Sequence, residues 1–296
     1  MIYIEQAGFG ATVQDRGRFE HVRAGVPVSG PADPFAFRAA RSLVGNAADD
    51  AAIEIVGLPF SFRCDDSRLI AVTGRDVALR VRDRVPAWTS IFVRAGEIVT
   101  VSGSVRTRYG YVAISGGIAT DTVLGSRSTY ARAGLGRVLR SGDALPLGAA
   151  RRSAEDAGGH VSFMYGGEIA AMPGPHEGRF DDDVAARFFG ASFTAAPESD
   201  RQGLRLEGAE VAPRAGEILT CGVVAGAVQV PRGGKPIVLL ADHQTTGGYP
   251  IIATVIGADL GLVAQRAPGE TVRFYRVDRE RALLLGRERA ALLASA

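Results

Sequence analysis

Lysine, cysteine and histidine are scarce in this sequence, and their scarcity excludes several kinds of site. All of the 34 basic residues except Lys235 are arginine, so Schiff-base chemistry has a single candidate. Cys64 and Cys221 lie too far apart for a zinc site of ordinary spacing and are predicted to be reduced structural thiols. A histidine-rich centre would need nearly all of the four histidines. We therefore predict no metal site.

Long apolar runs and an excess of one charge are also absent. The longest apolar segments, such as 237–241, are far shorter than a membrane span. The N-terminus has neither the basic start nor the apolar stretch of a signal peptide. The 34 basic and 32 acidic residues give a net charge of +2, which excludes a general nucleic-acid or anionic-membrane surface. The sequence predicts a cytoplasmic protein that binds neither nucleic acid nor membrane.

Common catalytic and nucleotide-binding motifs are missing as well. Lys235 follows two glycines, but the other residues of a phosphate-binding loop are not in register. The glycine motifs at 8–10 and 134–136 lack the third glycine of a dinucleotide-binding loop. No serine lies in the G-x-S-x-G context of a nucleophile elbow. His176 and Glu177 are not followed by the second histidine of a zinc protease.

Glycine, in contrast, is abundant: it supplies 38 of the 296 residues, about twice its usual share. Glycines separate short runs with the period of a half-buried strand. In one run Val77, Leu79 and Val81 fall on one face and Arg80 and Arg82 on the other. Similar runs occur at residues 69–73, 98–101, 109–114, 161–165, 237–241, 251–256 and 271–275. This pattern predicts a mainly β fold, either a sandwich or a barrel.

Two helices are expected at corresponding places in the two halves of the chain. Asp33 is the expected N-cap of the first helix, followed by Pro34 at the first helical position and by Gly45 at the end. Asp181 is the expected cap of the second helix, which ends at Gly190. Each half therefore combines strands with one embedded helix.

The length of the chain favours two domains. The small, polar and glycine-ended segment 148–159 is the predicted boundary between them. We expect an N-terminal β-barrel domain over 1–150, a C-terminal β-barrel domain over 160–277, and a helical tail over 278–296.

The densest polar cluster occupies residues 240–250, between two apolar strands. It is longer than an ordinary hairpin loop. Asp242 and His243 have the chemistry of a base and a proton carrier, and Gly247 and Gly248 could present backbone amides to a ligand. A polar turn whose Thr and Gln side chains satisfy backbone groups is the structural alternative.

Two further clusters contain amide and guanidinium groups. Gln229 lies between two valines, so it points away from them, either to solvent or into the mouth of a barrel. Arg201 and Arg205 could bind a carboxylate or phosphate through paired hydrogen bonds. They could equally form the solvated face of a strand.

Loops rich in glycine and proline complete the set of polar clusters. Residues 10–18 form one, and residues 25–33 form another that ends at the helix cap Asp33. A helix N-terminus beside such a loop is also an anion site. A weaker loop ends at His176, which we interpret as structural or exposed.

Taken in order, these clusters resemble one family over roughly residues 1–277. The motifs are T-V-Q-D-R-G-R (12–18), G-V-P-V-S-G-P-A-D-P (25–34), A-I-E-I (52–55), P-G-P-H (173–176), S-D-R-Q-G-L-R-L-E-G (199–208), G-A-V-Q-V-P (226–231) and D-H-Q-T-T-G-G-Y-P (242–250). They resemble the biotin-dependent carboxyltransferase-like family, also known as allophanate hydrolase subunit 2, KipA or the C subunit of the ATP-dependent 5-oxoprolinase.

The resemblance implies two cyclophilin-like β-barrel domains, which agrees with the two strand-rich halves. It also implies partners: a KipI-like protein, which is the B subunit of 5-oxoprolinase, and a LamB/YcsF-like protein, which is its A subunit. The leading functional prediction is a subunit of an ATP-dependent 5-oxoprolinase-type complex, active only in the complex. Such a complex hydrolyses the lactam of 5-oxo-L-proline to L-glutamate, with ATP as its co-substrate.

Two other functions stay open on the sequence. A fused relative forms the carboxyltransferase part of urea carboxylase, so this chain could move a carboxyl group from carboxyl-biotin to a urea-like substrate. Lys235 is not in a biotin-carrier motif, so biotin would be a visiting ligand, and only under this alternative. The third reading is a non-enzymatic KipA-like regulator of a KipI-like partner. The absence of a fused carrier or carboxylase domain favours the hydrolase.

The resemblance and the side-chain chemistry together define a candidate site for an amide-like substrate. The predicted catalytic residues are Asp242, Gln244 and Thr245, with Asp242 transferring a proton. The predicted substrate-binding residues are Arg201, Gln229, Thr246, Gly247, Gly248, Tyr249, Gln14 and Asp33. The glycine amides are expected to hold a developing oxyanion. The family motifs carry other residues in place of His243, His176 and Ser29, which argues against an essential histidine or a serine nucleophile.

Overall fold

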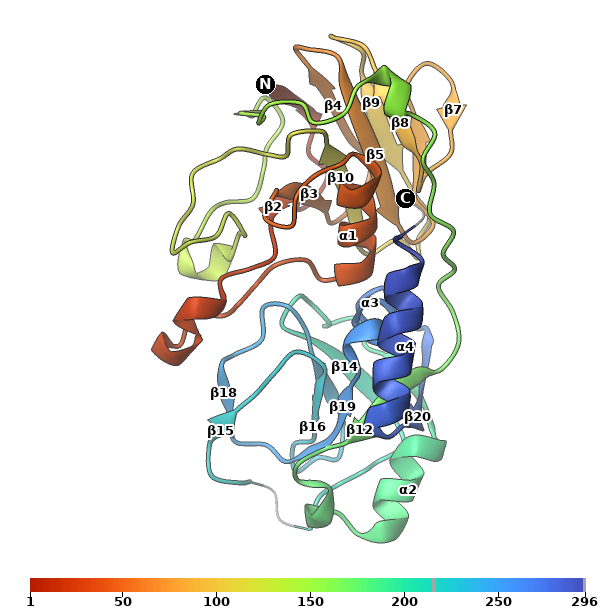
Figure 1. Cartoon of the computed structure of the whole chain (residues 1–296). Coiled ribbons are helices and arrows are strands. Elements are labelled where there is room, and N and C mark those ends of the chain that lie inside the picture. The colour runs from red at the N-terminus through yellow and green to blue at the C-terminus, as the bar shows by residue number, and fades with distance from the viewer. Residues whose placement is uncertain (215–216, 295–296) are drawn as a thin grey trace. The chain divides into compact units, whose positions relative to one another are not determined.

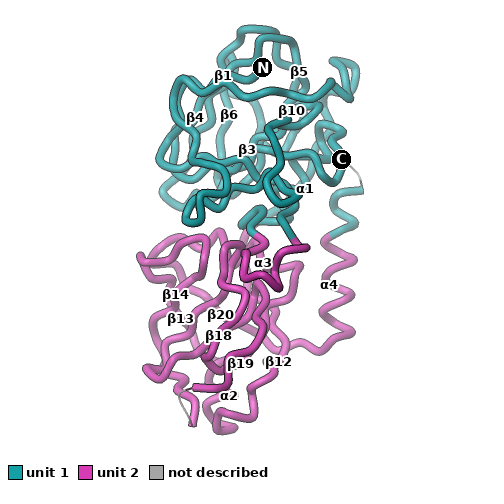
Figure 2. The backbone as a smooth tube through the Cα atoms, turned by 90° about the vertical axis from the view of Figure 1, so that its left-hand side faces the viewer, with its two compact units in different colours: residues 1–18, 29–164, 290–296 teal, residues 19–28, 165–289 magenta. Residues whose placement is uncertain are grey.

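The computed structural model describes residues 1–214 and 217–294 and is mainly β (Figure 1). It divides into two compact units, which Figure 2 shows in separate colours. Unit 1 contains Met1–Arg18, Ser29–Met164 and Ala290–Ala296, and unit 2 contains Phe19–Val28 and Tyr165–Arg289. The chain thus crosses from the main part of unit 1 to the main part of unit 2 after Met164, a few residues beyond the predicted boundary segment.

The strands of unit 1 form two antiparallel sheets. The six-stranded sheet has the order β11-β1-β4-β9-β6-β7, and the five-stranded sheet has the order β2-β3-β10-β5-β8. The strands are β1 (Ile2–Gln6), β2 (Thr12–Gln14), β3 (Ala52–Ile55), β4 (Phe60–Cys64), β5 (Arg68–Gly74), β6 (Ala78–Arg80), β7 (Arg84–Val85), β8 (Ser90–Val93), β9 (Val99–Ser102), β10 (Gly110–Ile114) and β11 (Ala144–Leu145). Both sheets contribute to one apolar core, which includes Ile4, Phe62 and Val112.

Helix α1 (Pro34–Leu43) begins and ends as the sequence predicts. The Asp33 side chain accepts a hydrogen bond from the Ala36 backbone N–H at 3.0 Å, which satisfies one of the unpaired groups of the first turn. Gly45 follows the helix with a φ of +69°, a conformation that glycine adopts without strain. The helix packs against β5 and β10 through its buried apolar face.

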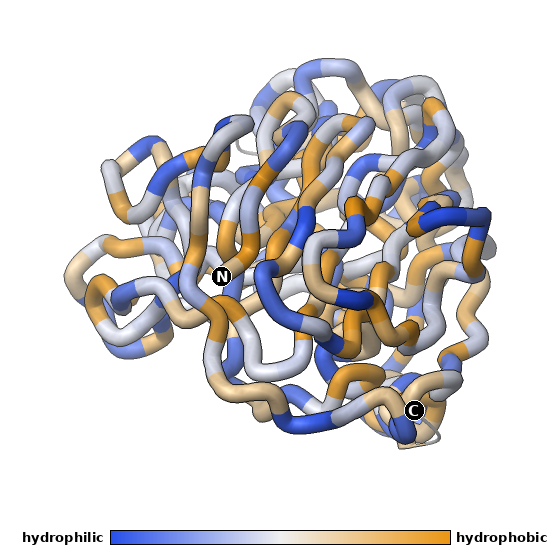
Figure 3. The backbone as a smooth tube through the Cα atoms, turned by 90° about the horizontal axis from the view of Figure 1, so that it is seen from above, coloured by the Kyte–Doolittle hydropathy of each residue, from blue (hydrophilic) through white to orange (hydrophobic). Residues whose placement is uncertain are grey.

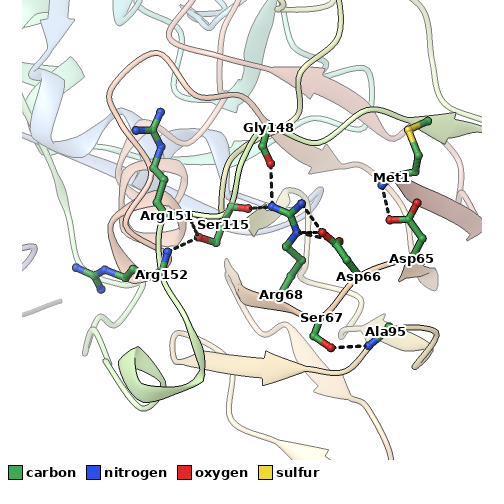
Figure 4. Close-up of polar contacts among 10 residues, drawn as sticks. All are labelled: Met1, Asp65, Asp66, Ser67, Arg68, Ala95, Ser115, Gly148, Arg151 and Arg152. Atoms are coloured by element: carbon green, nitrogen blue, oxygen red, sulfur yellow. Dashed lines mark hydrogen bonds and ion pairs between the residues drawn. The ribbon is translucent and has the colours of Figure 1, made fainter.

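A buried arginine ties the segment that follows β11 to the five-stranded sheet of unit 1 (Figure 4). The Arg68 guanidinium donates to the Asp66 carboxylate and to the backbone carbonyls of Ser115 and Gly148 (2.9 and 2.8 Å). The Ser115 hydroxyl accepts from the backbone N–H groups of Arg151 and Arg152. These bonds fix the course of residues 148–152 beside β5.

In unit 2 seven strands close into a barrel of order β12-β19-β16-β17-β14-β13-β20. The β12–β20 pair is parallel and the other described pairs are antiparallel. The barrel strands are β12 (Ile169–Pro173), β13 (Ser192–Ala195), β14 (Gly203–Gly208), β16 (Ala227–Gln229), β17 (Ile237–Leu239), β19 (Ile251–Val255) and β20 (Thr271–Arg276). A separate two-stranded sheet pairs β15 (Cys221–Gly222) with β18 (Thr246–Gly247).

Helix α2 (Asp182–Gly190) packs on the barrel by stacking Phe188 on Phe274, with ring centroids 4.8 Å apart. Asp181 occupies its N-cap position as predicted, but its side chain makes no capping hydrogen bond. The carboxylate instead pairs with Arg214 at 2.6 Å. Unit 2 also contains helix α3 (Leu260–Ala264), the greater part of α4 (Arg279–Ala291) and short 3-10 helices.

The mainly β class is confirmed, with a closed barrel in unit 2, while in unit 1 the strands are distributed over two sheets. The strand predicted at residues 161–165 is wrong. This segment has no ladder partner, and its Phe163 ring instead packs on Phe35 at 4.5 Å. Val161 is buried and Phe163 is half-buried, whereas Met164 is exposed, so the period of this segment does not reflect sheet pairing.

Apolar residues occur as short orange stretches between paler and blue ones along the chain in Figure 3. In keeping with this, none of the helices within residues 1–214 and 217–294 has the length and apolar character needed to cross a membrane.

The two helix caps provide a matched test of local stability. Asp33→Ala removes a buried capping bond, and we expect it to lower the free energy of unfolding by about 1–2 kcal/mol. Asp181→Ala removes only an exposed ion pair, so a change within about 0.5 kcal/mol is expected. Urea unfolding of the two variants measures both values. Equal losses would contradict the difference in capping.

Candidate active site in unit 2

The polar loop of residues 240–250 connects β17 to β19 in the barrel of unit 2. Both strands flank β16 and run antiparallel to it, so they run parallel to each other. A connection between parallel strands must return along their length, which explains why this loop is longer than a hairpin loop. The length of this loop therefore follows from the order of the strands in the barrel.

A second segment holds the returning loop in place. Strand β18, inside the loop, pairs with β15, and the two lie side by side in Figure 1. Beyond this pair, the Val223 N–H donates to the Thr245 carbonyl at 3.1 Å and the Ile218 N–H to the Gly248 carbonyl at 2.9 Å. Strand β15 is not among the strands predicted from the sequence, because a strand of two residues has no measurable period.

Gln229 and Gln244 meet where the loop returns. Gln229 is only 2% exposed, and its Oε1 accepts a hydrogen bond from Gln244 Nε2 at 3.0 Å. The buried Nε2 of Gln229 has no hydrogen-bond partner in the described protein. Leaving such a donor unsatisfied costs about 1–3 kcal/mol. In this orientation the unpaired group of Gln229 is an N–H donor.

Gly247 lies directly against this amide. A Cβ built at Gly247 would be 2.4 Å from Gln229 Nε2 and 3.4 Å from Gln244 Nε2. Glycine is therefore needed here for close approach of side chain and backbone rather than for a left-handed conformation.

Arg201 and Asp242 form a second polar pair where the loop leaves β17. The Arg201 guanidinium donates through Nε and Nη2 to the two Asp242 oxygens at 2.8 and 2.9 Å. The two side chains are 16% and 12% exposed, so solvent screens this pair only in part. The Asp242 backbone N–H also bonds the Arg201 carbonyl. Arg201, predicted to bind an anion, and Asp242, predicted to transfer a proton, are thus bonded to each other.

His243 is buried beside this pair. Burial lowers the pKa of His243, although its hydrogen bond to the Gln244 carbonyl and the charge of Asp242 act in the opposite direction. Its Nδ1 lies 2.5 Å from that carbonyl oxygen, so Nδ1 carries the proton and Nε2 is the acceptor nitrogen. The ring is a neutral group at pH 7.

His176 has a structural position, as the sequence predicts. Its Nδ1 accepts from the Ile251 N–H at 3.3 Å, and its own N–H bonds the Ile251 carbonyl. Partial burial and the nearby Arg179 charge lower the pKa of His176. The side chain joins the end of β12 to the start of β19.

The other predicted residues of the loop differ in exposure. Thr245 and Gly248 are half-buried, and Thr246 and Tyr249 are exposed. Of the predicted residues, those of the loop, Arg201 and Gln229 thus belong to unit 2, where Arg201 contacts Asp242 and Gln229 contacts Gln244.

Gln14 and Asp33 belong to unit 1 and are fully buried. Gln14 Nε2 donates to the Thr12 hydroxyl and the Thr129 carbonyl. The Asp33 N–H donates to the Tyr111 hydroxyl, which donates to Glu54 at 2.7 Å. Their predicted roles in binding stay predictions, since these hydrogen bonds are internal to the fold.

In the part of the chain that the structure describes, no three His, Cys, Asp or Glu side chains are grouped closely enough to hold a metal ion.

Comparison with known proteins gives the class of this chain. The family model "Carboxyltransferase domain, subdomain A and B" matches residues 24–276. The urea carboxylase structure from Kluyveromyces lactis has a TM-score of 0.89 and 27% identity over 99% of this chain, which spans 29% of that protein. The chain therefore belongs to the carboxyltransferase domain A and B family.

Within this family, curated relatives confirm the resemblance seen in the motifs. The C subunit of 5-oxoprolinase from Escherichia coli K12 is 36% identical over 96% of this chain and 93% of its own length. The protein of the same name from Haemophilus influenzae is also 36% identical, over 94% and 92%. The urea amidolyase of Lachancea kluyveri is 29% identical over 94% of this chain, but over 17% of its own length.

The contact between Gly247 and Gln229 can be tested by substitution. We expect Gly247→Ala to lower the free energy of unfolding by about 1 kcal/mol, because the added Cβ displaces the Gln229 amide. Gly222→Ala on the pairing strand is the matched control, since its Cβ would meet no atom within 4 Å. Urea unfolding of the single variants and of Gly247→Ala with Gln229→Ala measures the coupling. Strict additivity would contradict the contact.

Burial of a neutral His243 predicts a pH dependence of stability. The unfolded chain binds the histidine proton at an ordinary pKa, about 6.5, whereas the folded chain binds it only at lower pH. Stability is therefore present above the unfolded pKa and is lost as pH falls from about 7 to 5. The melting temperature of His243→Gln should fall less over this range than that of the unmodified chain. An equally steep fall in the variant would refute the assignment.

Proposed function

We propose that this chain is the C subunit of an ATP-dependent 5-oxoprolinase-type complex. In it, the chain and its partner subunits hydrolyse the lactam of 5-oxo-L-proline to L-glutamate. The observation that carries the proposal is the buried, unpartnered Nε2 of Gln229, fixed by Gln244 and lying against Gly247. A lactam presents a carbonyl oxygen, the acceptor that such an N–H group needs. The two relatives whose names identify them as the C subunit of 5-oxoprolinase support the same reading.

In this proposal the Gln229–Gln244 pair orients the lactam by its carbonyl oxygen. The backbone amides of Gly247 and Gly248 stabilise the negative charge that develops on this oxygen when the ring carbon is attacked. Thr245 takes part in the reaction at the half-buried part of the loop. The exposed residues Thr246 and Tyr249 contact the rest of the substrate.

Arg201 supplies positive charge for the substrate carboxylate or for a phosphorylated intermediate. Asp242 transfers a proton and also orients Arg201, because its two oxygens accept from that guanidinium. The two tasks are coupled through one ion pair. Loss of Asp242 is therefore expected to affect binding as well as turnover.

ATP is proposed as the co-substrate of the complex rather than a ligand of this chain alone. The sequence lacks a phosphate-binding loop, so the nucleotide is expected on the partner subunits or on a composite site. The proposed partners are the KipI-like B subunit of the complex and its LamB/YcsF-like A subunit.

Carboxyl transfer from carboxyl-biotin to a urea-like substrate is the second candidate. The match to the carboxyltransferase family model and the likeness to a urea carboxylase structure favour it. A ureido group offers the same carbonyl acceptor to Gln229 as a lactam does. Biotin would then be a visiting ligand held by a separate carrier protein.

The first test is ADP release by the chain combined with its two proposed partner subunits, without biotin. We expect release that requires both 5-oxoproline and this chain, because hydrolysis of the lactam is coupled to ATP. In the same assay Asp242→Ala and Gln244→Ala should abolish turnover while partner binding is kept. Thr194→Ala, on the exposed face of β13, is the matched control.

Two results would argue against this proposal. A folded, associated complex that shows no stimulation by 5-oxoproline would favour carboxyl transfer, and biotin binding would be measured next. Turnover near that of the unmodified complex in either loop variant would remove that residue from the catalytic set.

A further inference from the structure

Unit 1 contains a cavity of about 200 Å³ that the proposed function does not use. It lies between the segment around β2 and the loop that precedes β11. The Thr129 N–H bonds the Val13 carbonyl at 2.9 Å and the Leu139 N–H bonds the Ala11 carbonyl at 2.8 Å, so these segments are side by side. A volume of this size holds several water-sized groups and is sufficient for a small organic molecule.

The lining of the cavity combines an apolar part with hydroxyl groups. Val13, Leu139 and Leu145 contribute apolar side chains, each at most 6% exposed. Ser126 and Ser128 are both 1% exposed and form part of the opposite lining. A ligand with a compact apolar body is therefore favoured over a fully hydrated ion.

Arg18 adds a permanent positive charge to this lining. Its side chain is 2% exposed, and its Nη2 donates to the Ser128 carbonyl. A guanidinium stays protonated and matches the geometry of a carboxylate. Arg127 also lines the cavity, with its Nε held by the Thr120 carbonyl at 2.6 Å.

Asp15 lies behind this lining and fixes it in place. Its oxygens accept from the Ser126 and Ser128 hydroxyls at 2.5 and 2.7 Å, and from the Arg127 and Gly17 N–H groups at 2.6 and 2.9 Å. Burial by itself raises the pKa of Asp15, but these four hydrogen bonds outweigh it and lower the pKa. The carboxylate is thus stabilised by hydrogen bonds from four uncharged donors.

The other charged groups of the cavity lie nearer to solvent. Arg137 is exposed and pairs with Asp143 at 2.5 and 2.9 Å, which neutralises it. Asp121 is also exposed. Arg18 is thus the most deeply buried of the charged groups on the lining, and Arg127 is half-buried.

We propose that this cavity binds a small carboxylate with an apolar body. The carboxylate lies against Arg18, and the apolar body lies against Val13, Leu139 and Leu145. Two motifs build the site, residues 14–18 and residues 126–129. The proposal does not depend on the function proposed for unit 2.

Titration calorimetry of the full chain, without partner subunits or ATP, tests this proposal with sodium butyrate as the probe. We expect a single site with a dissociation constant on the order of 1 mM, and binding of uncharged butyramide at least about tenfold weaker. Arg18→Met should abolish butyrate binding.

Because Arg18 is buried, its replacement could also prevent folding, so a second variant is needed. Val123→Glu puts a carboxylate on the lining at a position that is 43% exposed, and it should weaken butyrate binding about tenfold or more. Val138→Glu, 39% exposed and outside the lining, should leave it unchanged. The proposal is overturned if butyramide binds as well as butyrate, if no binding occurs up to about 50 mM, or if the two glutamate variants behave alike.

Discussion

The pairing of β16 with both β17 and β19 is the constraint from which the candidate site in unit 2 follows. Two strands that flank a third in antiparallel fashion run parallel to each other, so their connection cannot be a tight turn. The chain must return along the barrel over residues 240–250. This return brings Asp242 to Arg201 at one point of the loop and Gln244 to Gln229 at another. The short β15–β18 sheet then holds the part of the loop that follows Gln244.

A buried polar group costs free energy unless it is paired, and the Arg201–Asp242 and Gln229–Gln244 contacts differ in this respect. At Arg201 and Asp242 the charges compensate each other with two hydrogen bonds of good geometry. At Gln229 one end of the carboxamide is paired and the other is not. An unpaired donor that is kept in the interior indicates either a cost borne by the fold or a ligand that satisfies it. The proposed function adopts the second explanation.

The features predicted correctly from the sequence are those that depend on residues close together in the chain. Prediction was less accurate where contacts between distant residues determine the structure. Asp33, Pro34 and Gly45 delimit α1 because capping and glycine geometry act within a few residues. Asp181 occupies the same position in α2, but Arg214, distant in sequence, takes its carboxylate. In residues 161–165, which form no strand, Phe163 packs on Phe35, a contact that no period along the chain reveals.

The candidate site in unit 2 shows the same difference between local features and long-range contacts. The motifs identified the residues of the loop, but they treated Arg201 and Asp242 as separate participants, since a bond between residues 41 positions apart leaves no local signal. The pairing changes the chemistry expected of both. Each Asp242 oxygen accepts a hydrogen bond from Arg201, so neither side chain enters the proposed reaction as an isolated charge. In the proposed function Asp242 therefore positions Arg201 in addition to transferring a proton, whether the substrate is a lactam or a ureido compound.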